Sequence, residues 1–132
     1  MAKRKRETGG GLCPCGAGSG YDECCGRLHR GESAATSAEQ LMRSRFSAFA
    51  RGDARYLLET WHPSTRPGDL TLDEGQRWLR LDVVDTAGGS IFEAAGEVEF
   101  KAHYRASGRT GTVHERSRFV REDGRWLYVA EV

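Results

Sequence analysis

The pattern of apolar positions changes along the chain, from a helical period in its middle to a strand period in its last third. Between residues 37 and 52, apolar side chains recur at intervals of three and four, as in an amphipathic helix. Ser37 followed by Gln40 forms a capping box, and Gly52 is suited to end the helix. The positions with this spacing are Leu41, Met42, Arg45, Phe46, Ala48 and Phe49.

A second helix is expected to follow at once. Asp53 can cap it, Leu57 and Trp61 lie one turn apart, and Pro63 disfavours helix for the residue before it.

A third helix is predicted over residues 71–80. Thr71 and Glu74 have the spacing of another capping box, and this helix would place Trp78 and Leu79 inward.

From residue 80 the apolar period becomes two, which is typical of strands with one buried face. Residues 96–105 alternate strictly, and Gly88-Gly89 and Asp123-Gly124 are expected hairpin turns. Helices followed by a strand meander predict an α+β fold, in which the helices cover one face of a curved antiparallel sheet. The inward set of residues 96–105 is Val98, Phe100, Ala102 and Tyr104.

The Asp123-Gly124 turn also predicts a register. With a two-residue loop, Arg121 pairs with Trp126, Phe119 with Tyr128 and Ser117 with Ala130, on the side that meets the helices. Glu115 then also points inward. The outer face would carry His114, Arg116, Arg118, Val120, Leu127 and Val129, and its apolar members could form a homodimer surface.

Length and composition place these elements in one soluble unit. The chain has 132 residues, of which 38% are hydrophobic and 30% charged, with a net charge of +1. No apolar run approaches the roughly 20 residues of a membrane helix, and the basic start has no apolar segment after it, so no secretory signal is expected. We therefore predict a cytoplasmic protein without membrane contact.

All four cysteines, Cys13, Cys15, Cys24 and Cys25, lie within thirteen glycine-rich positions. In a reducing compartment, clustered cysteines are more often metal ligands than disulfides, and bridges within so short a segment would close very small loops. We predict that the four thiolates bind one structural zinc ion in a closed tetrahedral site. His29 is expected to be a surface or packing residue, because the cysteines already fill the tetrahedron.

The cysteine segment resembles the SEC-C motif, a small bacterial zinc knuckle, although the basic residues usual between its cysteine pairs are missing here. The segments "LMRSRFSAF", "TWHPSTRP" and "HERSRFVREDGRW" resemble the uncharacterised bacterial YchJ family. This resemblance implies a SEC-C knuckle followed by a nuclear transport factor two-like cone with an internal cavity. The expected divisions are a disordered basic tail over 1–12, the knuckle over 13–31 and the cone over 32–132.

Polar residues near the expected cavity leave the function open. The candidates for a ligand pocket are Trp61, His62, Arg66, Tyr104, Glu115 and Arg116. We expect a binding or adaptor module, with a protein partner at the knuckle or a small-molecule ligand in the cavity, rather than an enzyme. An acid-base enzyme built on His62, Glu115 and Tyr104 is the alternative, since His114 and Glu115, as strand neighbours, point to opposite faces. RNA or ribosome contact through the basic residues 3–6 is a further alternative, although nucleic acid is not the expected partner.

Overall fold

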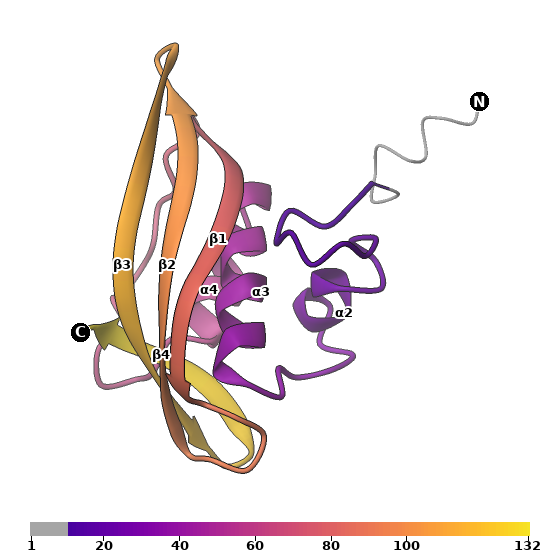
Figure 1. Ribbon diagram of the computed structural model, residues 1–132, viewed down its shortest axis with the longest axis vertical. Coiled ribbons are helices and arrows are strands. Elements are labelled where there is room, and N and C mark those ends of the chain that lie inside the picture. The colour runs from indigo at the N-terminus through magenta and orange to yellow at the C-terminus, as the bar shows by residue number, and fades with distance from the viewer. Residues whose placement is uncertain (1–10) are drawn as a thin grey trace.

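The computed structural model describes residues 11–132, so most of the predicted basic tail over 1–12 lies outside the described residues. Three layers follow one another across the molecule: the sheet, the helices α3 and α4, and the cysteine segment with α2 (Figure 1). No helix between residues 11 and 132 has the length and apolar character that crossing a bilayer requires. The elements are α2 (Cys25–His29), α3 (Ala38–Arg51), α4 (Ala54–Glu59), β1 (Gln76–Gly88), β2 (Ala95–Ala106), β3 (Arg109–Glu122) and β4 (Arg125–Glu131).

Helix α3 forms where the sequence predicts it. The Ser37 side chain accepts a hydrogen bond from the Gln40 amide, and Gly52 adopts a left-handed conformation at the other end, with φ of 77°. Helix α4 is capped by Asp53, which accepts from the Tyr56 amide. It ends at Glu59, before the expected stop at Pro63.

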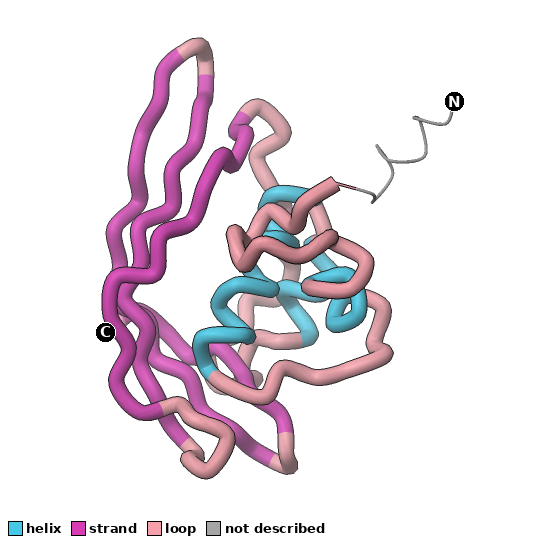
Figure 2. The backbone as a smooth tube through the Cα atoms, turned by 45° about the vertical axis from the view of Figure 1, so that its right-hand side comes forward, coloured by secondary structure: helices cyan, strands magenta, loops and turns pink. Residues whose placement is uncertain are grey.

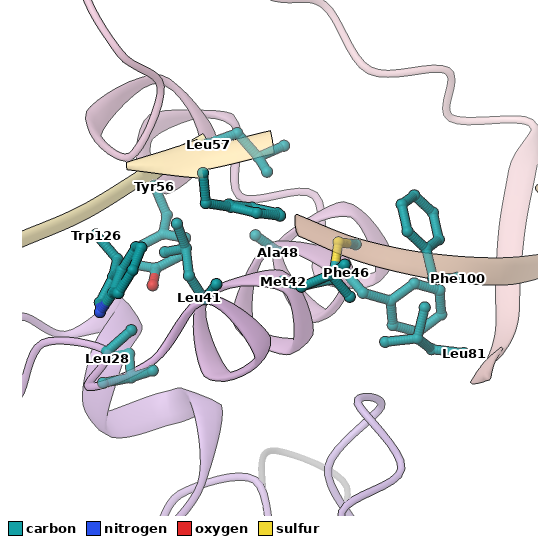
Figure 3. Close-up of a cluster of buried hydrophobic side chains, with 14 of the residues drawn as sticks. Leu28, Leu41, Met42, Phe46, Ala48, Tyr56, Leu57, Leu81, Phe100 and Trp126 are labelled. Carbon is teal, nitrogen blue, oxygen red and sulfur yellow. The ribbon is translucent and has the colours of Figure 1, made fainter. Parts of the chain in front are cut away.

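The four strands form one antiparallel sheet in the order β1-β2-β3-β4, which bends around the helices (Figure 2). Residues of β2 alternate as predicted, with Val98, Phe100 and Ala102 buried beneath α3. The main core lies between sheet and helices, and helix α2 contributes Leu28 to it (Figure 3). The expected α+β class and the helix-covered sheet are therefore confirmed.

The predicted helix over residues 71–80 is wrong. Asp73 accepts a hydrogen bond from the Gly75 amide in a short turn, and β1 begins directly after it at Gln76. Pairing with the whole length of β2 overrides the local helix signal, because it satisfies the backbone groups of β1 along one edge. Trp78 does face the core, but Leu79 lies on the opposite side and is 47% exposed.

The turn at Asp123-Gly124 sets the predicted register only near the turn. Arg121 pairs with Trp126 and Phe119 with Tyr128, but a bulge after Arg118 places Ser117 opposite Glu131 instead of Ala130. The bulge does not change which face Ser117 occupies, and this residue is buried on the helix side.

The outer face differs from the apolar dimer surface that the sequence suggests. Leu127 and Val129 are each only 8% exposed in the single chain, so they offer little surface to a second copy.

The turn between β1 and β2 is longer than the predicted Gly88-Gly89 turn, because β2 begins only at Ala95.

Candidate functional site

The four cysteines converge at one point. Their sulfur atoms all lie within 4.8 Å of one another, and Sγ of Cys15 lies 3.6 Å from Sγ of Cys24. A tetrahedral zinc site with bonds of about 2.3 Å separates its sulfur atoms by about 3.8 Å. All four thiols are free, and Cys24 is the one that retains partial exposure. This arrangement could hold a metal ion.

Backbone turns bring the two cysteine pairs together. The Cys13 amide donates to the Ser19 carbonyl at 2.8 Å, and Leu12 bridges to Gly20. Gly16 and Gly18 adopt positive φ angles of 83° and 97°, which other residues rarely do. The first pair therefore sits on a tight loop, and the second pair sits at the start of α2.

The cysteine segment is docked on helix α3. Nη1 of Arg43 donates to the Cys15 carbonyl at 2.7 Å, and Oγ of Ser47 lies 3.4 Å from Sγ of Cys13. The Arg51 guanidinium stacks on the Tyr21 ring, 3.9 Å from its centre. These contacts join the cysteine cluster directly to the helix that supports the sheet.

His29 completes this docking and is a packing residue rather than part of the cysteine cluster. Its Nε2 lies 2.9 Å from the Ser44 carbonyl, which requires the proton on this nitrogen, so Nδ1 accepts from the Tyr21 hydroxyl at 2.6 Å. The ring is 5% exposed and packs against Tyr56. Burial lowers the pKa of His29, which keeps the ring neutral.

The proximity of the thiols prevents all of them from ionising without a cation. Hydrogen bonds from Cys15 and Cys25 lower the pKa of the Cys13 thiol. The hydrogen bond with Cys13 raises the pKa of Cys15 to about 12, and the same cause raises the pKa of Cys25. A divalent cation would replace these shared protons and stabilise all the thiolates together.

A separate cavity of about 120 Å³ lies between α3 and the sheet. Trp61 and Glu115, two of the predicted pocket residues, line it. Burial of the carboxylate, with a smaller effect of Glu131, raises the pKa of Glu115. The other lining residues are Met42, Arg45, Phe49, Phe100, Ser117 and Tyr128.

The remaining predicted pocket residues do not line this cavity. His62 faces away from it, with Nε2 2.9 Å from Oε2 of Glu122. Arg66 donates to the Trp61 carbonyl at 3.0 Å. The structure therefore does not bring His62 and Glu115 together as an acid-base pair.

Tyr104 and Arg116 lie outside the cavity because of their positions in β2 and β3. Tyr104 lies near the end of β2 and packs edge-on against Trp78, with ring centres 5.4 Å apart. Arg116 follows Glu115 in β3 and so points to the outer face. There it pairs with Glu97 and, at 2.9 Å, with Asp85.

Arg45 lines the cavity although it is not among the pocket residues predicted from the sequence. It stands one turn after Leu41 and one turn before Phe49, on the buried stripe of α3, and is 4% exposed. A charged residue at a buried position of a helical period was the available signal, since arginine is almost never fully buried without a partner.

Comparison with known proteins agrees with this fold and with the cysteine cluster. The family described as "YchJ, middle NTF2-like domain" matches residues 37–131. A UPF0225 protein of Streptomyces coelicolor is 57% identical over 116 residues, covering 88% of this chain and 90% of the relative. A UPF0225 protein of Cupriavidus metallidurans is 50% identical over 133 residues, covering 96% and 92%.

Two solved structures are similar over most of the chain. The solution structure of a SEC-C motif containing protein from Rhodopseudomonas palustris has a TM-score of 0.79 at 36% identity, covering 91% of this chain and 96% of that one. The crystal structure of a SEC-C motif containing protein from Psychrobacter arcticus has a TM-score of 0.73 at 26% identity, covering 89% and 79%. With the match over residues 37–131 and relatives at 50% identity or more, this chain belongs to the YchJ family.

Proposed function

We propose that Cys13, Cys15, Cys24 and Cys25 bind one structural zinc ion, and that the protein is a zinc-stabilised binding or adaptor module. The observation that carries this proposal is the convergence of the four sulfur atoms within 4.8 Å. Soft thiolate ligands in a tetrahedron favour zinc or iron–sulfur chemistry, and a single compact cluster of this size suits one zinc ion.

Four protein ligands leave no open position on the metal, so the zinc would not activate water. Its role would be to hold the loop and α2 in the shape that docks on α3. The segment from residue 11 to 31 buries few side chains of its own, and metal binding would supply the folding energy that it lacks.

The outward side of the zinc-binding segment is available to a protein partner. Its loop over residues 16–19 is exposed and carries only small side chains. The exposed Arg30 pairs with both Asp22 and Glu32 on this surface. Because this charge is already matched, the described surface favours a protein partner over a polyanion such as RNA.

Metal analysis of the purified protein tests the zinc proposal. We expect one zinc ion per chain in the wild type and in Ser19→Ala, a control in the same exposed loop. Cys24→Ser should bind zinc at least tenfold more weakly, since one of four ligands is lost. Cobalt added in place of zinc should give the visible absorption of a tetrahedral thiolate site. A wild type that takes up no zinc, or a Cys24→Ser variant with unchanged affinity, would contradict the proposal.

The adaptor role is tested by native purification of tagged protein followed by protein mass spectrometry. Ala17→Arg should lose a stoichiometric partner that the wild type and Ser19→Ala retain, while its zinc content stays at one per chain. If all three proteins are recovered alone, the adaptor role is wrong even where the zinc is present.

A further inference from the structure

Arg45 is a buried cation whose hydrogen-bonding capacity is only partly used. Its guanidinium carries five N–H donors, and Nη1 donates to the Leu57 carbonyl at 2.8 Å and to Oγ1 of Thr60 at 2.7 Å. Among residues 11–132, Nε and Nη2 donate no hydrogen bond, and no carboxylate forms an ion pair with Arg45. One edge of the guanidinium is therefore left without an acceptor.

Aromatic rings surround this charge instead of a carboxylate. The guanidinium carbon lies 4.6 Å from the ring centre of Tyr128 and 5.2 Å from that of Trp61. These cation–π contacts offset part of the cost of burial but do not satisfy the free N–H groups. Burial still lowers the pKa of Arg45 to about 10.

The cavity beside Arg45 is small and mostly apolar. Its volume of about 120 Å³ is below the roughly 300–1,000 Å³ of pockets for drug-sized ligands, so it suits a molecule of few heavy atoms. Met42, Phe49 and Phe100 supply apolar walls, and the Ser117 side chain supplies a hydroxyl group. Phe49 and Trp61 retain partial exposure, so the cavity reaches the surface.

We propose that this cavity binds a small monocarboxylate with a short apolar tail, whose carboxylate pairs with the free edge of Arg45. Planar carboxylates match two parallel N–H groups of a guanidinium. The tail would lie against the apolar walls, and Ser117 could donate a hydrogen bond to a carboxylate oxygen.

The charges of the cavity favour a monocarboxylate over phosphate. In the described part of the chain, residues 11–132, Arg45 is the one cation that lines it, and Glu115 supplies a carboxyl group of the opposite sign. A phosphate dianion would face both an excess of negative charge and apolar walls that cannot replace its hydration. The proposal does not depend on zinc, because the cavity lies on the sheet side of α3.

Titration of the zinc-loaded protein followed by two-dimensional ¹H–¹⁵N NMR tests this inference. Sodium butyrate should shift the Ser117 amide and the Trp61 indole signals in a saturable manner. Butyramide, which has the same shape without the charge, and inorganic phosphate should each bind at least tenfold more weakly. This comparison uses the wild type alone and so does not depend on the folding of any variant.

Variants then show which residue supplies the positive charge that binds butyrate. Arg45→Met should bind butyrate at least tenfold more weakly, whereas Arg55→Met, which removes an exposed arginine of α4, should bind it as the wild type does. Glu115→Gln should bind butyrate at least as tightly as the wild type. Equal binding of butyrate and butyramide, unchanged binding by Arg45→Met, or shifts confined to residues outside the cavity would overturn the proposal.

Discussion

Loss of the metal should destabilise the whole protein and not only the cysteine segment, because α2 is part of the main core. Leu28 is 4% exposed and packs with Leu41 and Trp126 in the cluster of Figure 3. If the segment leaves α3 when its metal is removed, this side chain returns to water along with the docking hydrogen bonds.

The size of this effect follows from the contacts. Re-exposing a buried leucine costs about 2 to 3 kcal/mol. The buried hydrogen bond from His29 to Ser44 and the half-buried one from Arg43 to Cys15 contribute about 1 kcal/mol each. The sum of about 4 to 5 kcal/mol corresponds to a fall in Tm of about 16 to 20 °C, at roughly 4 °C per kcal/mol for a domain of this size.

Tryptophan fluorescence measures this effect from outside the cysteine segment. All three tryptophans, Trp61, Trp78 and Trp126, lie outside residues 11–31, so the midpoint of their thermal transition reports the unfolding of the helices and the sheet. Undocking of Leu28 changes the surroundings of Trp126 and so the emission of the native baseline, which is fitted separately from the midpoint. We expect a strong chelator to lower the midpoint of this transition by about 16 to 20 °C, and added zinc to restore it.

A packing variant separates docking from metal binding. Leu28→Ala should keep its zinc and lose about 2 to 5 kcal/mol of unfolding free energy, and chelation should then destabilise it by less than it destabilises the wild type. An unchanged tryptophan transition after complete removal of zinc would refute the reasoning, since it would mean that the docking contacts contribute nothing.

Two other predictions rest on single residues. Because burial lowers the pKa of His29 below its ordinary value of 6.5, NMR titration should find this ring neutral, with the proton on Nε2, at pH values where an exposed histidine is charged. The His29 ring therefore takes up its second proton more readily in the unfolded chain than in the folded protein. Its contribution to stability is complete above about pH 6.5 and is lost as the pH falls from there toward the pKa of His29 in the folded protein. Gly96→Ala should cost at least about 2 kcal/mol in chemical denaturation, because the added Cβ would clash with the backbone of Gly89. Gly68→Ala meets nothing within 4 Å and should change stability by less than about 0.5 kcal/mol. A charged His29 at pH 6.5, or equal stability of the two glycine variants, would contradict the respective prediction.

Local chemistry explains which elements were predictable. Helix α3 begins where Ser37 accepts a hydrogen bond from the Gln40 amide, and it ends at the left-handed Gly52. Both signals lie within one turn of the helix end that they set, so the bounds of α3 follow from neighbouring residues. The Asp123-Gly124 turn is equally local, and both residues adopt the left-handed conformation. The cysteine cluster can also be predicted from the sequence, because its four cysteines lie within thirteen positions of the chain.

Long-range pairing explains the errors. The segment over residues 71–80 carries a helical signal, but β1 gains its hydrogen bonds from β2, and Trp78 pairs with Tyr104 across the sheet. The bulge after Arg118 likewise depends on how β4 meets β3 and has no mark in the sequence. Strand pairing outweighs the local helix propensity, because one ladder of hydrogen bonds satisfies many backbone groups together.

The sequence by itself determined the α+β class, the caps of α3 and α4, the alternation of β2 and a set of four thiols close enough to share one ion. Only the tertiary structure decided that α2 joins the main core, that His62 and Glu115 lie apart, and that Arg45 faces a cavity without a carboxylate partner. The physical reason is distance along the chain. Caps, turns and cysteine spacing act between near neighbours, whereas the surroundings of a buried charge are set by side chains from α3, β2, β3 and β4 that meet only when the protein folds.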